Sequence, residues 1–317
     1  MTIIGYHASH EQIAPSTLLA DVQRAEAVGF DAALCSDHLA PWGTAQGESG
    51  FAWSWLGAAM ASTTLPFGVV TAPGQRYHPV VIAQAVATLA EMFPGRFWAA
   101  YGSGEAVNEH VTADPWPDKD TRRRRVTASV EAIRRLLEGE QVDLDDVVRI
   151  HQARIWSRPA TQPPAIAASA SPDSARWAAR WADGMITVGI DPQSTSQVLS
   201  AYRDAGGTGE TMLQAHVSLA PSEDEALAIA TDQWKHATAS ATMWDVEQPE
   251  DFDALAEPTP EAMRSSVAIA GSVEQLAGQL TAAGRGFDHL YIHHVGQDQS
   301  YFLDRADDLI SVLKETL

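Results

Sequence analysis

The chain contains a single cysteine, Cys35, so it can form no internal disulfide, which is the pattern of a protein kept in a reducing compartment. It also lacks an apolar run of transmembrane length, and no basic segment followed by an apolar one stands at its start. We therefore expect a cytoplasmic protein that has no contact with a membrane.

Basic residues are scarce. The 317 residues include 21 Lys and Arg against 41 Asp and Glu, which gives a net charge of −20 at pH 7. Such a surface repels nucleic acid and anionic membranes, so the sequence argues against both as partners. With 45% hydrophobic residues, a chain of this length can bury a sizeable core.

Signatures of several enzyme classes are also missing. No pair of cysteines indicates a metal site, and the adjacent His293 and His294 would point to opposite faces of a strand, so we expect no metal. No nucleophile elbow indicates Ser/His/Asp chemistry. The glycine-containing segment 102–109 lacks the third glycine and the distal acid of a dinucleotide fingerprint.

What the chain does contain is an alternation of short apolar runs with segments of helical periodicity. Strands are predicted at 3–7, 32–35, 66–71, 96–101, 165–168, 185–188, 213–219 and 290–293. Strand-then-helix units in succession imply a parallel sheet with right-handed crossovers. Eight such strands in one domain favour an α/β fold, a (β/α)8 TIM barrel with insertions that covers residues 1–317.

The connecting segments are predicted to be mostly helical. Helices are expected at 15–28, 53–63, 79–93, 119–138, 172–181, 193–204, 223–235, 272–283 and from 299 onward. Two segments break this rhythm: 147–159 has the pattern of a hairpin, and 240–262, with three prolines, indicates an irregular insertion.

In a TIM barrel the reactive residues lie at the carboxyl ends of the strands. The predicted strand ends carry His7, Asp37, His38, Thr71, the segment 102–105, Ser169, Thr187, His293 and His294. Each residue alone has a plain structural explanation, because an Asp can cap a loop and a His can be a satisfied core residue. Their convergence on one end of the barrel is what indicates a site.

Within that set, His38 is the candidate proton-transfer group, and Glu105 is the carboxylate expected to reach it. Two glycines at 102–104 permit close approach of a ligand to the backbone, although a plain strand-to-helix turn would use them too. Aromatic side chains that could wall a planar cofactor or belong to the core are Trp42, Phe51, Trp53 and Trp55. The four arginines at 122–125 are expected to form a solvated helix face paired with local acids.

At these residues the sequence resembles the luciferase-like flavin and deazaflavin oxidoreductases, in the branch of the coenzyme F420-dependent glucose-6-phosphate dehydrogenases. The resemblance covers nearly the whole chain. The matching segments are 6–15, 36–38 with 41–42, 76–79, 102–109, 182–184 and 296–299. The fold that the resemblance implies is again the TIM barrel.

The resemblance implies a role for individual residues. His38 would be the base that removes the substrate hydroxyl proton while a hydride passes to the cofactor, Glu105 would be the acid beside the reduced ring, and Trp42 would steady the charge. The implied cofactor contacts are Asp37, Val69, Val70, Ala72, Ser103, Gly104, Asn108, Ala170 and Ser171. Members of this family also carry a non-proline cis peptide, which would fall at Val69–Val70 here.

Departures from the family pattern bear on substrate and cofactor. The lysines that hold the sugar phosphate in the dehydrogenases align with Asp191 and Ser265, so glucose 6-phosphate is not the expected substrate. A sub-branch that shares segment 70–75 is thought to use FMN. F420 carries an additional anionic tail, and only Arg76 and Arg285 are expected near the barrel mouth. The cofactor is therefore FMN or F420, with FMN favoured.

The sequence thus predicts an oxidoreductase that moves a hydride to or from a small organic substrate, with FMN or F420 as cofactor. Two alternatives stay open: an FMN-dependent monooxygenase of the same fold, and a non-catalytic flavin-binding protein. The expected partner is a small-molecule substrate, and a homodimer is compatible with the sequence.

Overall fold

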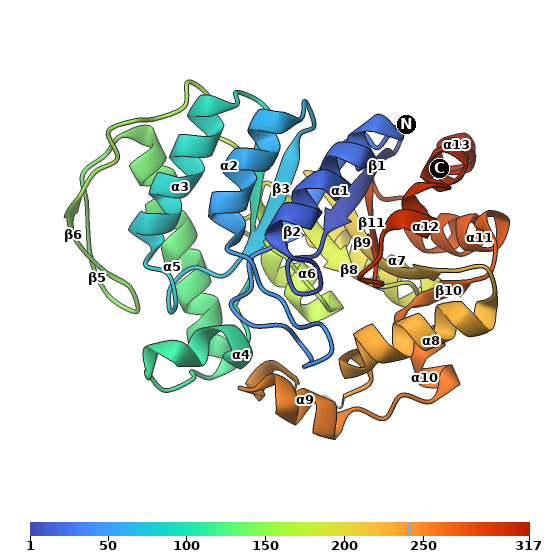
Figure 1. Ribbon diagram of the computed structural model, residues 1–317. Coiled ribbons are helices and arrows are strands. Elements are labelled where there is room, and N and C mark those ends of the chain that lie inside the picture. Colours follow the sequence, from blue (N-terminus) through green and yellow to red (C-terminus); the bar gives the residue numbers. More distant parts are fainter. Residues whose placement is uncertain (240–242) are drawn as a thin grey trace.

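A closed barrel of eight parallel strands forms the centre of the protein (Figure 1). The computed structural model describes residues 1–239 and 243–317. The strands are β1 (Ile3–Ala8), β2 (Ala32–Ser36), β3 (Phe67–Thr71), β4 (Phe97–Tyr101), β7 (Ala165–Ala168), β8 (Gly184–Val188), β9 (Glu210–Leu219) and β11 (His289–His294). They pair in the order β9-β11-β1-β2-β3-β4-β7-β8, and β8 pairs with β9 to close the ring. The predicted TIM barrel is confirmed.

Helices surround the barrel and return the chain to the start of each next strand. They are α1 (Pro15–Ala27), α2 (Ala52–Ser62), α3 (Pro79–Met92), α5 (Lys119–Glu138), α6 (Pro172–Ala178), α7 (Pro192–Asp204), α8 (Glu223–Trp234), α11 (Val273–Gly284) and α13 (Ala306–Thr316). Their ends follow local chemistry. The Asp118 side chain accepts a hydrogen bond from Thr121 N at the start of α5, and Gly139 ends that helix at a φ of 90°. None of the described helices is long and apolar enough to cross a membrane.

Large side chains fill the barrel interior near the amino ends of the strands. Trp98 on β4 and Tyr291 on β11 lie with their ring centroids 6.0 Å apart. Each ring lies over a glycine on a neighbouring strand, because a Cβ atom at Gly68 would lie 2.1 Å from Trp98 and one at Gly5 would lie 2.3 Å from Tyr291. The barrel is therefore closed at the amino end of its strands, and only the carboxyl end offers room for a ligand.

Short elements are added to this plan. The hairpin β5 (Val142–Asp145) and β6 (Arg149–Ala153) projects from the barrel (left in Figure 1) and begins earlier than the predicted 147–159. A short strand that the sequence did not predict, β10 (Ala268–Ala270), pairs with β9. The remaining short helices are α4 (Ala106–Glu109), α9 (Pro249–Leu255), α10 (Pro260–Ser266) and α12 (Ser300–Leu303).

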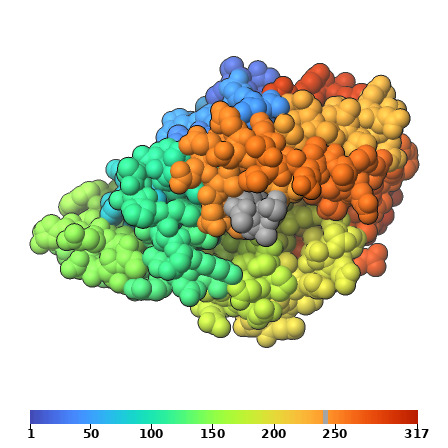
Figure 2. Space-filling view, turned by 90° about the horizontal axis from the view of Figure 1, so that it is seen from below, coloured from blue at the N-terminus to red at the C-terminus, as the bar shows by residue number. Residues whose placement is uncertain are grey.

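The prediction of an irregular insertion at 240–262 is wrong for its second part. Pro249 and Pro260 each occupy the first turn of a helix, where the missing N–H of proline costs nothing. Residues 240–242 lie outside the described part. Figure 2 looks onto the mouth of the barrel, where the segment that contains α9 (orange) lies beside the segment that contains α4 (teal). The insertion therefore covers part of the mouth.

The expected cis peptide at Val69–Val70 is wrong, since the described residues contain no cis peptide bond. Val69 pairs with Cys35 and Ala99, and Val70 pairs with Ser36 and Ala100. The two valines continue a regular ladder with both neighbouring strands.

Candidate active site

His38 and Glu11 form the centre of the candidate site. His38 follows β2 and Glu11 follows β1, two adjacent strands, and His38 Nδ1 lies 2.5 Å from Glu11 Oε1. The Ser9 hydroxyl donates a hydrogen bond of 2.8 Å to the other carboxylate oxygen of Glu11. The Glu11 side chain is 3% exposed and that of His38 is 13% exposed, so only the imidazole reaches the open end of the barrel. Its Nε2 is the atom left to meet a substrate.

The two groups shift each other's pKa values. Burial alone would lower the pKa of His38, but the neighbouring carboxylate of Glu11, with a smaller contribution from Glu105, raises it above the usual 6.5. Burial would raise the pKa of Glu11, but His38 and the hydrogen bonds to the carboxylate lower it to about 2. The site therefore holds a permanently ionised carboxylate beside an imidazole that binds a proton readily.

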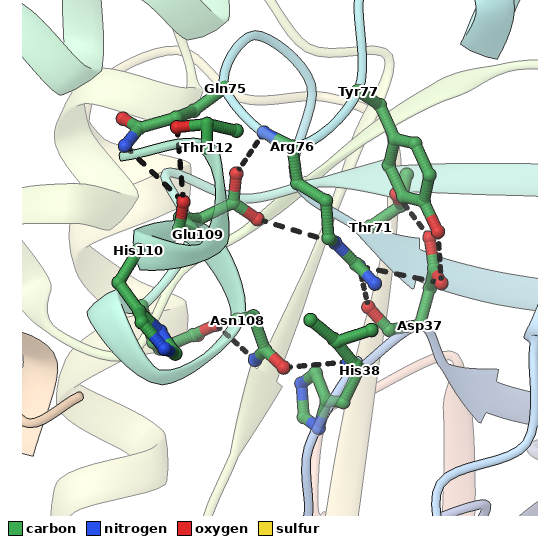
Figure 3. A network of polar contacts seen from close by, with 12 residues as sticks. Asp37, His38, Thr71, Gln75, Arg76, Tyr77, Asn108, Glu109, His110 and Thr112 are labelled. Carbon is green, nitrogen blue, oxygen red and sulfur yellow. Dashed lines mark hydrogen bonds and ion pairs between the residues drawn. The ribbon is translucent and has the colours of Figure 1, made fainter. Parts of the chain in front are cut away.

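Glu105 does not contact His38, contrary to the sequence prediction that it is the direct partner. It stands at the start of α4, half-buried, and accepts a hydrogen bond of 3.4 Å from Asn108 Nδ2. Asn108 Oδ1 accepts from the backbone N–H groups of Leu39 at 2.8 Å and Ala40 at 3.3 Å. Asn108 thus joins the loop after β2 to the loop after β4 (Figure 3). Glu105 acts on His38 through its charge alone.

Trp42 lies against His38, a position that suits a residue at the reacting centre. The two rings meet edge to face with their centroids 5.1 Å apart. Phe252 of α9 also packs against the indole, with a centroid distance of 5.5 Å, so the insertion supports the position of Trp42. Trp53 and Trp55 are buried core residues, while Phe51 is exposed and pairs with Tyr77.

The carboxylate of Asp37, a predicted cofactor contact, is enclosed by groups of the protein. It accepts hydrogen bonds from Trp53 Nε1 at 2.9 Å, Thr71 Oγ1 at 2.9 Å and the Tyr77 hydroxyl at 3.1 Å. Arg76 Nη2 lies 3.5 Å from the same carboxylate. Asp37 therefore joins the end of β2 to the end of β3 and to the loop that follows it (Figure 3).

Arg76 belongs to the same network. Its Nη2 donates a hydrogen bond of 2.6 Å to the carbonyl of Asp37, its Nε lies 3.7 Å from Glu109 Oε1, and its guanidinium stacks on Tyr77 at 4.3 Å. Burial raises the pKa of Glu109 to about 7 although Arg76 lies beside it. The Nη2 and Nε atoms of the Arg76 guanidinium are thus directed at acceptors of the protein, Asp37 and Glu109.

These contacts weaken one reason for favouring FMN. Arg76 Nη2 and Nε are directed at Asp37 and Glu109, and Arg285 follows α11 and precedes β11, at the opposite end of the barrel from the mouth. Three arginines of the run at 122–125 lie beside acids, but Arg125 donates a hydrogen bond of 2.6 Å to Gln75 Oε1 and only Arg124 is exposed, so the predicted solvated face is confirmed in part. Arg123 lies 2.7 Å from Asp173, Arg124 lies 3.0 Å from Asp146, and Arg122 lies 3.6 Å from Asp245. These acids are distant in sequence, not local.

Near the carboxyl ends of the strands, the barrel interior has two different halves. Alternation along the strands turns small or apolar side chains inward on one side and imidazole and amide groups on the other. The small half consists of Ser36, Val70, Gly102, Ala168 and Val188. The imidazole half consists of His7, Gln214, His216 and His293.

The side chains of the small half leave room for a flat ring. Gly104 has a φ of +74°, and a Cβ atom there would lie 3.2 Å from the Cβ of Ala72. Ser103 and Ala170 are exposed on the rim, and Ser171 caps α6. Val69 differs from the other predicted contacts, because its side chain faces the outer helices. The small side chains therefore fit a flavin or deazaflavin ring, with Val69 able to contribute only its backbone.

The imidazole half is uncharged at neutral pH. Burial lowers the pKa of His7 to about 3 and that of His216 to about 4, and it also lowers the pKa of His293. No group of His, Cys, Asp or Glu within the described ranges could hold a metal ion. As the sequence predicted, His294 points away from His293 and stacks on Phe302, at a centroid distance of 5.2 Å.

Comparisons with known proteins agree with this arrangement. Residues 3–289 match the model of the luciferase-like monooxygenase family. The chain is 34% identical over 330 residues to an F420-dependent glucose-6-phosphate dehydrogenase of Beutenbergia cavernae, covering 99% of this chain and 98% of that protein. It is 35% identical over 265 residues to an F420-dependent hydroxymycolic acid dehydrogenase of Mycobacterium tuberculosis, covering 81% of this chain and 72% of that protein.

A solved structure has the same fold. An F420-dependent secondary alcohol dehydrogenase in complex with an F420-acetone adduct superposes with a TM-score of 0.90 at 27% sequence identity. The superposition covers 98% of this chain and 99% of that chain.

Proposed function

Because this chain is an oxidoreductase that belongs to the luciferase-like monooxygenase family, we propose that it is a dehydrogenase that oxidises a small alcohol and passes the hydride to F420. The observation that carries the proposal is the His38–Glu11 pair, whose imidazole holds Nδ1 against a buried carboxylate and leaves Nε2 free. Oxidation of an alcohol requires such a base, because the hydroxyl proton must leave as the carbinol hydride departs.

The residues of the chain have separate tasks in this reaction. The bound cofactor supplies the acceptor for the hydride. His38 Nε2 takes the hydroxyl proton, and the ionised Glu11 stabilises the imidazolium that results. Trp42 packs against the edge of the imidazole and excludes water from it. Glu105, half-buried at the start of α4, would be the acid nearest the reduced ring, the role that the resemblance gives it.

The residues that would hold the cofactor line the small half and the rim above it. We assign them as Val70, Ala72, Ser103, Gly104, Asn108, Ala170 and Ser171, with backbone groups of Asp37 and Val69. Support for F420 over FMN comes from the F420-dependent relatives that match nearly the whole chain. The contacts of Arg76 with Asp37 and Glu109 also support F420, because they make this side chain less available to an FMN phosphate.

Titration of the apoprotein tests the choice of cofactor. F420 at micromolar concentration should raise the melting temperature by mass action, because it binds the folded protein alone, whereas FMN at the same concentration should not. Differential scanning fluorimetry with each cofactor measures this directly.

Three outcomes would contradict parts of the proposal. Stabilisation by FMN alone would show that the choice of F420 is wrong. A reduced complex that reacts rapidly with oxygen would favour the monooxygenase. Binding of a cofactor that no alcohol reduces would favour the non-catalytic binding protein.

A further inference from the structure

Two polar side chains on β9 have no task in the mechanism above. Gln214 and His216 face the barrel interior and are only half-buried, whereas His7 and His293 beside them are fully buried. The imidazole of His216 lies 5.1 Å from that of His293 and 4.5 Å from the ring of Trp234. Gln214 and His216 are thus the accessible members of the imidazole half.

Hydrogen bonds determine which nitrogen of each imidazole carries the proton. Gln12 Nε2 donates to the carbonyl of Val295, so Gln12 Oε1 is the acceptor for His293 Nε2 at 2.9 Å. His293 Nδ1 is then an acceptor. Gln214 Nε2 lies 3.5 Å from His293 Nδ1 and 3.4 Å from His216 Nε2, so its amide group can donate to both rings. Because His216 Nε2 accepts and the ring is neutral, its proton is assigned to Nδ1.

This assignment leaves one donor and one acceptor free. Within the described ranges, His216 Nδ1–H and Gln214 Oε1 have no hydrogen-bond partner, and neither is a buried atom. A hydroxyl group both donates and accepts, so it satisfies the two together.

The charges around these groups exclude an anion. His7, His216 and His293 are neutral, and the carboxylate of Glu11 acts on the pKa values of His7, His216 and His38 alike, which places it close to all three. A phosphate or carboxylate brought here would meet the negative charge of Glu11, and the neutral imidazoles of His7, His216 and His293 would offer it no positive charge. An uncharged ligand meets no such repulsion.

We propose that His216 and Gln214 bind a second hydroxyl group of the substrate, so that the preferred substrates are uncharged vicinal diols or polyols. The inference rests on the proposed function only in that the oxidised hydroxyl is the one at His38. It separates the chain from enzymes for simple alcohols and for phosphorylated sugars.

Substrate preference of the wild-type holoprotein gives the first test. With F420 bound, kcat/KM for anaerobic cofactor reduction should be at least several-fold higher with propylene glycol than with isopropanol, and glucose 6-phosphate should be poorer than glucose. H216F and Q214L should each lower kcat/KM for the diol about 3- to 10-fold, the value of one lost hydrogen bond, and leave isopropanol unchanged. M212L, which changes an apolar inward residue of the same strand, is the matched control.

Binding provides a readout that needs no turnover. The dissociation constant of glycerol or glucose, followed by quenching of the F420 fluorescence of the oxidised complex, should rise in H216F and Q214L but not in M212L. Equal kcat/KM values for isopropanol and propylene glycol in the wild type would overturn the inference, whether or not the variants fold, and would leave the dehydrogenase intact. Weakened polyol binding in the variants without oxidation of any alcohol would support the binding site and reject the dehydrogenase.

Discussion

His38→Ala should slow cofactor reduction at saturating alcohol by about 10²-fold or more, which is the usual contribution of a positioned general base. His38 is the side chain whose Nε2 faces the mouth while its Nδ1 is held by Glu11. Alanine leaves the hydroxyl proton without an acceptor, so the loss should fall on the chemical step. Single-turnover stopped-flow measurements of cofactor reduction would show it.

Cofactor affinity separates this effect from damage to the site. The contacts proposed for the cofactor lie on the small half and its rim, so the dissociation constant of F420 should change little in His38→Ala. His151→Ala, on the exposed hairpin, is the matched control and should behave as the wild type, since this imidazole is 86% exposed. A wild-type rate in His38→Ala would remove His38 from the mechanism.

Glu11→Gln should reduce the rate about 10- to 100-fold and move the acid limb of the pH–rate profile to lower pH. His38 must be neutral to accept a proton, so alcohol oxidation falls as the pH drops through the pKa of His38. The Glu11 carboxylate raises that pKa against the effect of burial. Without the carboxylate burial prevails, the pKa falls, and the loss of activity begins at a lower pH.

The matched comparison is Glu105→Gln, which removes the same charge from a residue that does not contact His38. Its shift should have the same direction and be smaller. If Glu105→Gln shifts the profile further than Glu11→Gln, Glu105 is the working partner of His38 and the assignment of Glu11 is wrong. The reverse reaction, reduction of a carbonyl compound, needs the protonated imidazole. At neutral pH its rate should therefore fall more in Glu11→Gln than the rate of alcohol oxidation does.

The barrel could be predicted from the sequence because each strand and helix is determined locally. All eight strands have apolar runs of the right length, and α5 begins and ends at the residues expected from the pattern. The position of His38 followed from the same reasoning, because it depends only on where β2 ends.

The partner of His38 could not be predicted in this way. The His38–Glu11 pair joins loops that follow two different strands, so it depends on which strands are neighbours and on how the loops turn. Glu105 follows a strand end just as Glu11 does, and nothing local distinguishes the two acids. Segment 6–15 does carry Glu11 shortly after the first strand, which makes it a candidate but gives no reason to prefer it to Glu105.

Other errors in the site had more elementary causes. Val69 and Val70 are both predicted as cofactor contacts, but alternate residues of a strand face opposite sides, so only the Val70 side chain enters the barrel. The resemblance implies a cofactor contact for Asp37, and Arg76 is predicted near the mouth as a candidate for an anionic group of the cofactor. Their charges instead satisfy one another and Glu109 inside the loop network, as buried charges must.

Direct hydride transfer from an alcohol to the bound cofactor is the central claim, and isotope labelling tests it. The F420-loaded protein would be incubated anaerobically with isopropanol and propylene glycol that carry deuterium on the carbinol carbon, and the cofactor would then be analysed by mass spectrometry. We predict that the reduced F420 gains one deuterium from the alcohol, and that reduction is slower than with unlabelled alcohol. Reduced cofactor without the label, or no reduction by either alcohol, would contradict the account.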